Sequence, residues 1–351
     1  MSLIHDLGLG LLRRLDVETA HTLTLDLLKA GLGPAARGGD DPALAVQVAG
    51  LWLPNCVGLA AGFDKGAEVF GPMLRAGFGM VECGTVTPLP QPGNPRPRAF
   101  RLAEDRAVIN RYGFNSQGLE PFAARLARRS GPGVVGANIG ANKEAQDRAG
   151  DYVTGLRRLW TLADYFTVNI SSPNTPGLRA LQAREALDEL LGRVAEARAG
   201  LTADSGARPV FLKVAPDLTL AEIDDVCASV ETHRLDGIIV GNTTVSRPDG
   251  LRAAARGEAG GLSGAPLFAL STRVLGQFHE RLSGRLPLIG CGGIGGGAEA
   301  YAKIRAGASA VQLYTALAYQ GAGLVQAIKH DLAARLRADG FTSVSEAVGA
   351  G

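Results

Sequence analysis

Apolar and polar positions alternate in blocks along most of this chain. From residue 55 onward, a short apolar run is followed by a turn rich in glycine or asparagine and then by a stretch of helical pattern. Strands that are apolar throughout and separated by helices are typical of a parallel sheet covered on both faces. The eight predicted strands cover residues 55–62, 79–87, 133–140, 165–171, 209–216, 237–244, 286–294 and 310–317.

Eight such units predict an α/β fold, a (β/α)8 TIM barrel, whose usual size is about 250 residues. An open doubly wound sheet is the alternative, because periodicity alone does not exclude it. In a barrel, the C-terminal ends of the strands meet at one mouth, where active sites lie. Polar or small residues close all eight predicted strands, so we expect a lined pocket there. These include Gly62, Thr85, Asn138, Asn169, Lys213, Asn242, Gly293 and Thr315.

The first 40 residues differ from this pattern and predict two short helices ahead of a barrel domain over residues 41–351. Asp16 is suited to cap the second helix. The pair is either a helical cap packed on the barrel or a hairpin that rests on a membrane surface and admits an apolar ligand. Apolar residues recur at helical spacing at Leu3, Ile4, Leu7, Leu11 and Leu12 in the first helix, and at Ala20, Leu23, Leu27 and Leu28 in the second.

Composition narrows the class of protein. The chain has 351 residues, of which 46% are apolar and 20% charged, as in soluble globular proteins. A net charge of +2 gives no basic face that would suggest nucleic acid. The four cysteines form no CxxC pair and lack metal spacing to histidine, so we expect free buried thiols and no metal. We also expect no signal peptide, and no apolar run reaches the roughly 18 residues that span a bilayer.

Two stretches carry candidate chemistry. The glycine-rich segment 290–297 follows the seventh predicted strand, where barrels often bind phosphate through backbone N–H groups. Lys213 lies inside a strand that should be buried, so its ammonium needs an anionic partner or a lowered pKa. It could form a Schiff base, stabilise the charge of a reduced flavin, or make a structural salt bridge.

Polar side chains around the predicted mouth suggest the ligand. A ring of asparagine amides suits a neutral, planar, amide-rich heterocycle, although some of them cap turns. Ser172 lies in a polar loop after the fourth predicted strand, without a GxSxG motif, so acyl transfer is not expected. A serine can still act as a base if its proton passes to water. The asparagines are Asn110, Asn115, Asn138, Asn142, Asn169, Asn174 and Asn242.

Six ordered motifs resemble the dihydroorotate dehydrogenase family, the FMN enzymes of pyrimidine synthesis, over nearly the whole chain. Class 1 members carry cysteine at the base position, whereas this chain has Ser172. The segment "LDVETAH" (15–21) also resembles class 2, the quinone-linked, membrane-associated branch, which favours the membrane-facing hairpin over the simple cap. The motifs are "AAGFDK" (60–65), "INRYGFNS" (109–116), "NISSPNTPGLR" (169–179), "GNTT" (241–244), "GGLSG" (260–264) and "GCGGI" (290–294).

The resemblance implies a role for each matching residue. Ser172 is the expected base, and His21 and Arg101 match positions that line the quinone entrance. Gly241, where some relatives have threonine, keeps its backbone contact. FMN is expected to be held by Ala60, Ala61, Gly62, Thr85, Asn138, Asn169, Lys213, Gly241, Gly264, Gly293, Tyr314 and Thr315. Dihydroorotate is expected to be held by Lys65, Asn110, Arg111, Tyr112, Gly113, Phe114, Asn169, Asn174, Asn242 and Thr243.

The implied reaction is the oxidation of (S)-dihydroorotate to orotate in de novo UMP synthesis. Hydride passes to FMN, and electrons then pass to a membrane quinone at the cytoplasmic side of the cell membrane, where the protein is expected to bind peripherally. Two alternatives remain open. One is a related FMN oxidoreductase that uses fumarate or NAD, and the other is a flavin-free barrel lyase with Lys213 as a Schiff base. A non-catalytic binding protein would leave Ser172, Lys65 and Lys213 unexplained.

Overall fold

Eight parallel strands close into a barrel in the structure, a computed structural model that describes residues 10, 12–36, 38–175 and 177–351. The prediction of a closed barrel is therefore confirmed, and the open sheet is excluded. Each predicted apolar run contributes one strand. In barrel order, the strands are β10 (Gly237–Val240), β12 (Leu288–Cys291), β13 (Ala308–Leu313), β3 (Val57–Leu59), β4 (Met80–Val86), β7 (Val134–Ile139), β8 (Tyr165–Asn169) and β9 (Val210–Val214).

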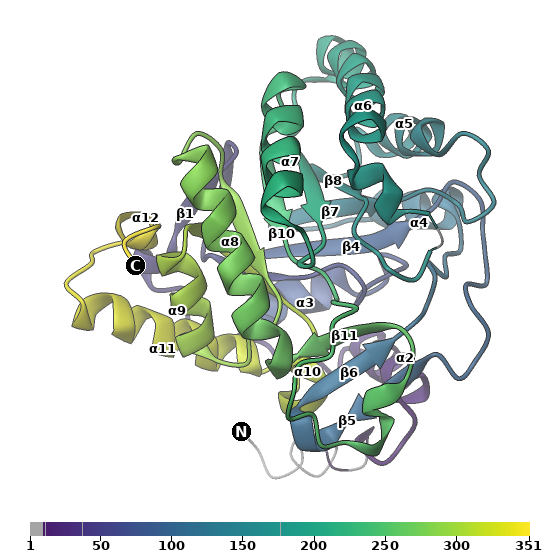
Figure 1. Ribbon diagram of the computed structural model, residues 1–351. Helices are drawn as coiled ribbons and strands as arrows, with labels where there is room; N and C mark the ends of the chain where they lie inside the picture. The colour runs from purple at the N-terminus through teal and green to yellow at the C-terminus, as the bar shows by residue number, and fades with distance from the viewer. Residues whose placement is uncertain (1–9, 11, 37, 176) are drawn as a thin grey trace.

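Helices surround the barrel and bury its outer face (Figure 1). The strands are buried along nearly their whole length, as expected when both faces of a parallel sheet are covered. At the start of α7, Thr219 and Glu222 form a capping box. The helices are α3 (Phe70–Ala76), α4 (Leu119–Leu126), α5 (Arg148–Leu159), α6 (Arg184–Ser205), α7 (Leu220–Thr232), α8 (Phe268–Leu282), α9 (Gly297–Arg305), α10 (Leu317–Gln320), α11 (Leu324–Ala338) and α12 (Val344–Ala347).

Two small antiparallel sheets were not predicted from the pattern. The hairpin of β1 (Val46–Val48) and β2 (Leu51–Leu53) precedes the first barrel strand. A three-stranded sheet joins β5 (Ala99–Leu102), β6 (Ala107–Asn110) and β11 (Gly261–Gly264). Its strands come from insertions after β4 and β10, and Figure 1 shows it beside α2 and α10. Two distant insertions therefore build this sheet of β5, β6 and β11 next to the barrel, and the sheet is called the platform below.

Helix α2 (Val17–Lys29) confirms the second predicted N-terminal helix. Asp16 caps it as expected, accepting hydrogen bonds from the backbone N–H groups of Glu18 and Thr19. The Glu18 carboxylate pairs with Arg98 at 2.6 Å and fastens α2 to the segment before β5. The first predicted helix lies almost entirely outside the described residues.

The apolar side chains of α2 face two directions. Ala20 and Leu28 are buried, whereas 41% of Leu23 and 37% of Leu27 remain exposed. Leu15 and Leu32, just outside the helix, are exposed as well. These four residues, called the exposed leucines below, place apolar side chains in contact with solvent in and beside α2.

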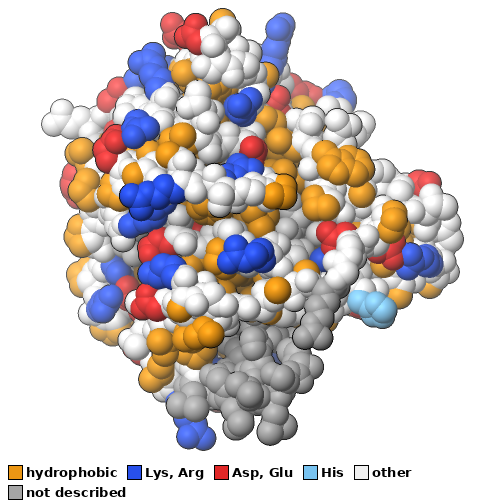
Figure 2. Space-filling model, turned by 180° about the vertical axis from the view of Figure 1, so that it is seen from behind, with side chains coloured by type: hydrophobic (Ala, Val, Ile, Leu, Met, Phe, Trp, Pro, Cys, Tyr) orange, Lys and Arg blue, Asp and Glu red, His pale blue; other side chains and the backbone are white. Residues whose placement is uncertain are grey.

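The surface charges, the thiols and the helix lengths also bear on what the sequence predicts. Basic and acidic side chains are interspersed on the face shown in Figure 2. All four cysteines are free and buried, as predicted. Within the described ranges, no helix has the length and apolar character needed to cross a membrane. Those same residues include no group of three or more His, Cys, Asp or Glu side chains placed to hold a metal ion.

Candidate active site

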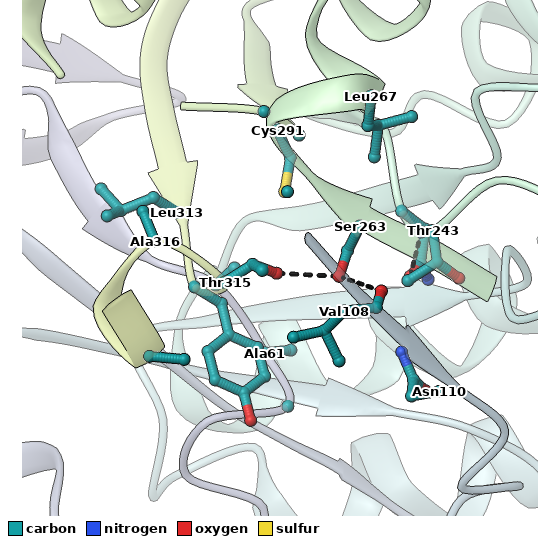
Figure 3. A pocket seen from close by; sticks show the side chains of 18 of the residues that line it. Ala61, Val108, Asn110, Thr243, Ser263, Leu267, Cys291, Leu313, Thr315 and Ala316 are labelled. Carbon is teal, nitrogen blue, oxygen red and sulfur yellow. Dashed lines mark hydrogen bonds between the residues drawn. The ribbon is translucent and has the colours of Figure 1, made fainter. Parts of the chain in front are cut away.

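A cavity of about 260 Å³ lies at the mouth of the barrel, between the strand ends and the platform. Figure 3 shows how the platform is joined to the barrel across it. The Thr315 hydroxyl, at the end of β13, donates to Ser263 of β11 at 2.9 Å, and Ser263 donates to the Val108 carbonyl of β6 at 3.0 Å. The cavity is thus enclosed by a barrel wall and a sheet wall that are hydrogen-bonded to each other.

Thr85, Asn138 and Asn169 form a buried hydrogen-bonded triangle at the ends of β4, β7 and β8. Asn138 Oδ1 accepts from Thr85 Oγ1 at 2.5 Å and from Asn169 Nδ2 at 3.1 Å, and Asn169 Nδ2 also donates to Thr85 Oγ1 at 2.9 Å. The register between β4 and β7 shifts at Thr85, because Gly84 pairs with Asn138 and Val86 with the next residue of β7. Such a bulge redirects a side chain, and Thr85 lines the cavity here.

Lys213, in β9, has the anionic partner that its burial requires. Its Nζ lies 3.7 Å from the carboxylate of Glu82, which is fully buried in β4. Within the described residues, Lys213 Nζ has no hydrogen-bond acceptor inside 3.5 Å, and the side chain lines the cavity. Its three N–H donors are therefore available to a ligand.

The loop after β8 brings Ser172 and Asn174 to the cavity. Ser172 is 7% exposed, and its hydroxyl accepts a hydrogen bond from the Asn174 backbone N–H at 3.3 Å. The Asn174 amide donates to Asn110 Oδ1 at 3.3 Å, so the loop touches the platform. Arg179 braces the loop, donating to the Ser171 carbonyl at 3.1 Å and pairing with Asp217 at 2.8 Å.

Lys65 follows β3 and is a second ammonium group at the cavity. Its Nζ donates to Asn115 Oδ1 at 2.6 Å and lies 3.5 Å from the centre of the Tyr112 ring. Burial, together with the neighbouring Arg98 guanidinium, lowers the pKa of Lys65 to about 7. No carboxylate of the described chain pairs with it, so an anionic ligand group would satisfy it.

A glycine-rich loop forms another wall and leads into α9. Gly292 to Gly295 line the cavity, and their backbone N–H groups donate to no carbonyl of the described chain. A Cβ atom on Gly293, whose φ is +77°, would lie 2.4 Å from the Phe268 backbone. Free N–H groups at the start of a helix form a ready anion site, which fits a phosphate.

Most of the candidate residues named from the sequence line this one cavity. Asn138 and Gly241 do not; Asn138 lies behind Thr85 and Asn169. Arg111 does not line it either, because its guanidinium pairs with Glu258 at 2.8 Å and covers the Phe100 ring. The lining candidates are Ala60, Ala61, Gly62, Lys65, Thr85, Asn110, Tyr112, Gly113, Phe114, Asn169, Ser172, Asn174, Lys213, Asn242, Thr243, Gly264, Gly293, Tyr314 and Thr315.

Sequence reasoning missed four polar residues that line the cavity, and it also missed Glu82 beneath the cavity. The four are Arg106, Ser263, Glu299 and Gln320. Ser263 links the platform to Thr315, and its motif "GGLSG" was noted for its glycines alone. Glu82 lies inside the predicted second strand, and a charged residue in an otherwise apolar run was the available signal. Thr243 was expected, and its buried Oγ1 has no hydrogen-bond partner in the described chain, as a ligand-binding hydroxyl would.

The sequence and the fold match known proteins. The family model for dihydroorotate dehydrogenase matches residues 43–336. The chain belongs to the dihydroorotate dehydrogenase family. A curated relative from Azorhizobium caulinodans, "Dihydroorotate dehydrogenase (quinone)", is 57% identical over 337 residues and covers 95% of both chains. A relative of the same name from Xanthobacter autotrophicus is 57% identical over 344 residues, covering 97% of this chain and 96% of the relative.

Solved structures of the same family agree. DHODH from Eimeria tenella in complex with ferulenol has a TM-score of 0.91 and 40% identity, with 95% of both chains covered. The ligand-free DHODH from that organism has a TM-score of 0.92 and 42% identity, covering 95% of this chain and 99% of the other. The predicted family and fold are therefore confirmed.

Two groups of residues that line the cavity are considered separately below. The barrel end is defined by Lys65, Asn169, Ser172, Lys213 and Asn242, and the α2 end is defined by Val17, Tyr314, Ala318 and Tyr319.

The two residues matched to the quinone entrance lie near the α2 end without lining the cavity. His21 packs edge-on against Phe63 at 5.3 Å between ring centres and lies 6.0 Å from Tyr314. Arg101 donates to the backbone carbonyls of Arg13 at 2.7 Å and Leu15 at 2.9 Å.

Proposed function

We propose that this chain oxidises (S)-dihydroorotate to orotate in pyrimidine synthesis, with FMN as its cofactor, Ser172 as its base and a membrane quinone as its electron acceptor. The observation that carries the proposal is the meeting of Ser172, Lys65, Lys213 and the glycine-rich loop in one cavity of a dihydroorotate dehydrogenase fold. It is an oxidoreductase acting on a CH–CH donor.

The barrel wall has the features that FMN requires. The free N–H groups of the loop at Gly292 to Gly295 suit its phosphate, and the Lys213 ammonium suits the pole of the isoalloxazine ring that becomes negative on reduction. When bound, FMN accepts a hydride from the substrate and passes electrons on to the quinone. In this proposal, Thr85, Asn169 and Thr315, which line the cavity, orient FMN, and Lys213 supplies the charge.

Dihydroorotate fits the other polar groups at the barrel end. Lys65 lines this end and has no carboxylate partner in the described chain, so we expect it to meet the carboxylate of the substrate. The amides of Asn110, Asn174 and Asn242 and the free Thr243 hydroxyl supply both donors and acceptors for a ring of amide groups. Arg111 takes no part through its side chain, because Glu258 already holds that side chain outside the cavity.

Ser172 is the candidate that can remove the C5 proton of the substrate. It is the serine that lines the cavity on the loop after β8, and its low exposure keeps bulk water away from the reacting carbon. Its hydroxyl accepts one hydrogen bond, from the Asn174 backbone, so its own proton remains free to pass to water. The brace at Arg179 holds the loop against the barrel.

The α2 end suits an apolar electron acceptor. Val17, Tyr314 and Tyr319 give it an apolar and aromatic lining, and the exposed leucines lie on the adjoining surface segment. A leucine-rich surface next to an apolar opening is suited to the interface of a bilayer, where a quinone dissolves. We therefore assign the protein to the cytoplasmic side of the cell membrane as a peripheral protein.

The alternatives are weaker on specific grounds. Both curated relatives carry the quinone designation in their names, which disfavours fumarate or NAD as acceptor. The family match disfavours the Schiff-base lyase, because the family model and both curated relatives are named dihydroorotate dehydrogenase.

An anaerobic visible spectrum before and after adding dihydroorotate tests the proposal. We expect the purified protein to show oxidised-flavin bands that disappear with dihydroorotate and return with a soluble quinone analogue. A flavin spectrum that does not change would contradict the substrate. A colourless protein that cannot take up FMN would contradict the cofactor and revive the lyase reading.

A further inference from the structure

A buried carboxylate, Glu82, lies beneath the mouth of the barrel without lining the cavity. Four neutral side chains donate hydrogen bonds to it. Asn138 Nδ2 reaches Oε1 at 2.7 Å, while Oε2 accepts from Gln312 at 2.9 Å, Thr167 at 3.0 Å and Tyr165 at 3.2 Å. Lys213 Nζ lies 3.7 Å from Oε1 as an ion-pair partner, so the carboxylate is surrounded by four hydrogen-bond donors and one cation.

An ionised carboxylate can only accept hydrogen bonds, so it fixes the direction of every bond that ends on it. Asn138 must turn its NH2 group toward Glu82, which leaves Asn138 Oδ1 facing Thr85 and Asn169. Asn169 must then donate to Asn138, which leaves Asn169 Oδ1 to accept from the Ser171 hydroxyl at 2.7 Å.

The hydrogen bonds keep the same donor-to-acceptor direction as far as the opposite side of the barrel mouth. The Ser171 hydroxyl is already donating to Asn169, so it accepts from Asn242 Nδ2 at 2.7 Å. One chain therefore runs from Asn242 through Ser171, Asn169 and Asn138 to Glu82, across strand ends of β10, β8, β7 and β4. Two of its members, Asn169 and Asn242, line the cavity.

Glu82 also balances the charge of Lys213. The two groups form an ion pair at 3.7 Å with almost no solvent exposure, so their interaction is weakly screened. Removing the negative charge would leave a full positive charge at the cavity wall.

We infer that Glu82 is a positioning residue of this site: its carboxylate sets the direction of the amide chain that presents Asn169 and Asn242, and its charge holds the midpoint potential of the bound flavin down through Lys213. The inference rests on the proposed FMN function. Nothing in it requires Glu82 to touch FMN or substrate.

The first test compares the flavin midpoint potential of wild-type protein and Glu82→Gln in a dithionite titration at about pH 6, well below the usual pKa of lysine. We expect a more positive potential in the variant, equivalent to at least about a tenfold change in the reduction equilibrium, or about 30 mV for a two-electron couple. Glu82→Asp keeps the charge and should stay close to wild type. Equal potentials in wild type and Glu82→Gln would overturn the charge role.

The second test measures orotate affinity from the flavin spectrum. A glutamine at position 82 must itself donate, so it competes with Asn138 for acceptors and disturbs the chain. We expect orotate to bind about tenfold more weakly to Glu82→Gln. Thr167→Val is the matched control, because it removes one neutral donor to Glu82 but keeps the carboxylate and the Asn138 contact. An equal loss of orotate affinity in Glu82→Gln and Thr167→Val would mean that any change among the buried polar groups weakens binding. That result would overturn the proposal that Glu82 sets the direction of the hydrogen bonds.

Glu82→Gln could instead fail to fold, because removing one partner of a buried ion pair is costly. The double variant Glu82→Gln/Lys213→Met removes both charges and should then have the higher melting temperature of the two. A double variant no more stable than the single one would overturn the pairing.

These measurements separate this inference from the proposed function. Dithionite replaces dihydroorotate as reductant, so the potential does not depend on which substrate the protein uses. Wild-type protein that binds no flavin would contradict the proposed function itself. Wild-type protein that binds flavin, beside a Glu82→Gln variant of unchanged potential, would contradict the inference alone.

Discussion

At the barrel end of the cavity, polar side chains are hydrogen-bonded to one another and converge on Glu82, whereas at the α2 end the lining is apolar and aromatic. The barrel end is made by strand ends that the closed barrel holds in place. At the α2 end, Val17 comes from α2, which the Glu18 pair with Arg98 helps to fasten, whereas Ala318 and Tyr319 come from α10. Under the proposed function, this difference would separate two tasks: fixing a polar substrate against a cofactor, and admitting an apolar electron acceptor.

Lys65 at the barrel end and His21 near the α2 end both have lowered pKa values, but the consequences for charge differ. Burial and the nearby Arg98 lower the pKa of Lys65 to about 7, so it can gain a proton when an anion binds. Burial and the Lys65 ammonium lower the pKa of His21 to about 4, which leaves His21 neutral at physiological pH. The α2 end therefore presents no charge from this histidine. If this division is right, substitutions at one end should spare the half-reaction of the other.

Ser172→Ala should have the largest effect. Removing a positioned base costs about 10²- to 10⁴-fold, so dihydroorotate should reduce the flavin that much more slowly at neutral pH, while FMN stays bound. Stopped-flow absorbance would measure the rate. Thr175→Val is a matched control on the same loop, because Thr175, unlike Thr243, does not line the cavity, and its buried hydroxyl has no partner in the described chain. Undiminished reduction by Ser172→Ala would refute its assignment as the base.

Lys65→Met should weaken orotate binding by about ten- to a hundredfold, because a charged hydrogen bond is lost. The wild type should also show a pH dependence. Below pH 7, Lys65 is already protonated in the free protein, so affinity is constant. A bound carboxylate raises the pKa of Lys65, so affinity should fall up to tenfold per pH unit above about 7. Spectral titrations at several pH values would measure this, and Lys65→Met should lack the slope. A flat wild-type profile would argue against Lys65 as the carboxylate's partner.

The sequence was sufficient to predict the barrel, because fully apolar runs separated by helices have few other solutions. It also predicted Ser172, Lys65 and most lining residues, because strand ends converge in a barrel and the motifs resemble one family. The platform was missed, since β5, β6 and β11 are short and β11 pairs with β6, which lies about 150 positions earlier in the chain. No local pattern encodes such a pairing.

Side-chain direction was the other limit. Arg111 lies inside a substrate motif, yet Glu258, a residue 147 positions later, holds its guanidinium outside the cavity. Asn138 was expected to contact FMN, but Glu82 and the triangle with Thr85 and Asn169 occupy its amide. Both outcomes depend on partners from distant elements, which spacing in the sequence does not reveal.

Deleting residues 1–30 should affect the α2 end alone. We expect quinone turnover in vesicles to fall by at least about tenfold, because Val17 and the exposed leucines of α2 are lost from this end, while dihydroorotate still bleaches the flavin. The deletion stops at residue 30 because Asp40 pairs with Lys329 and accepts from Asn55 at 2.7 Å, and these contacts belong to the barrel. Equal quinone turnover with and without the segment would refute the proposed access route.

The smallest expected effect concerns the exposed leucines. Leu23→Ser/Leu27→Ser should weaken binding to anionic lipid vesicles by about tenfold or less, because each half-exposed leucine would lose part of its transfer free energy to the bilayer interface. Flotation with vesicles would measure the bound fraction. Trp52→Ser is the matched control, since Trp52 is 66% exposed but lies in the β1–β2 hairpin away from α2. Equal losses in both variants would show that general surface hydrophobicity, rather than the α2 end, sets membrane binding.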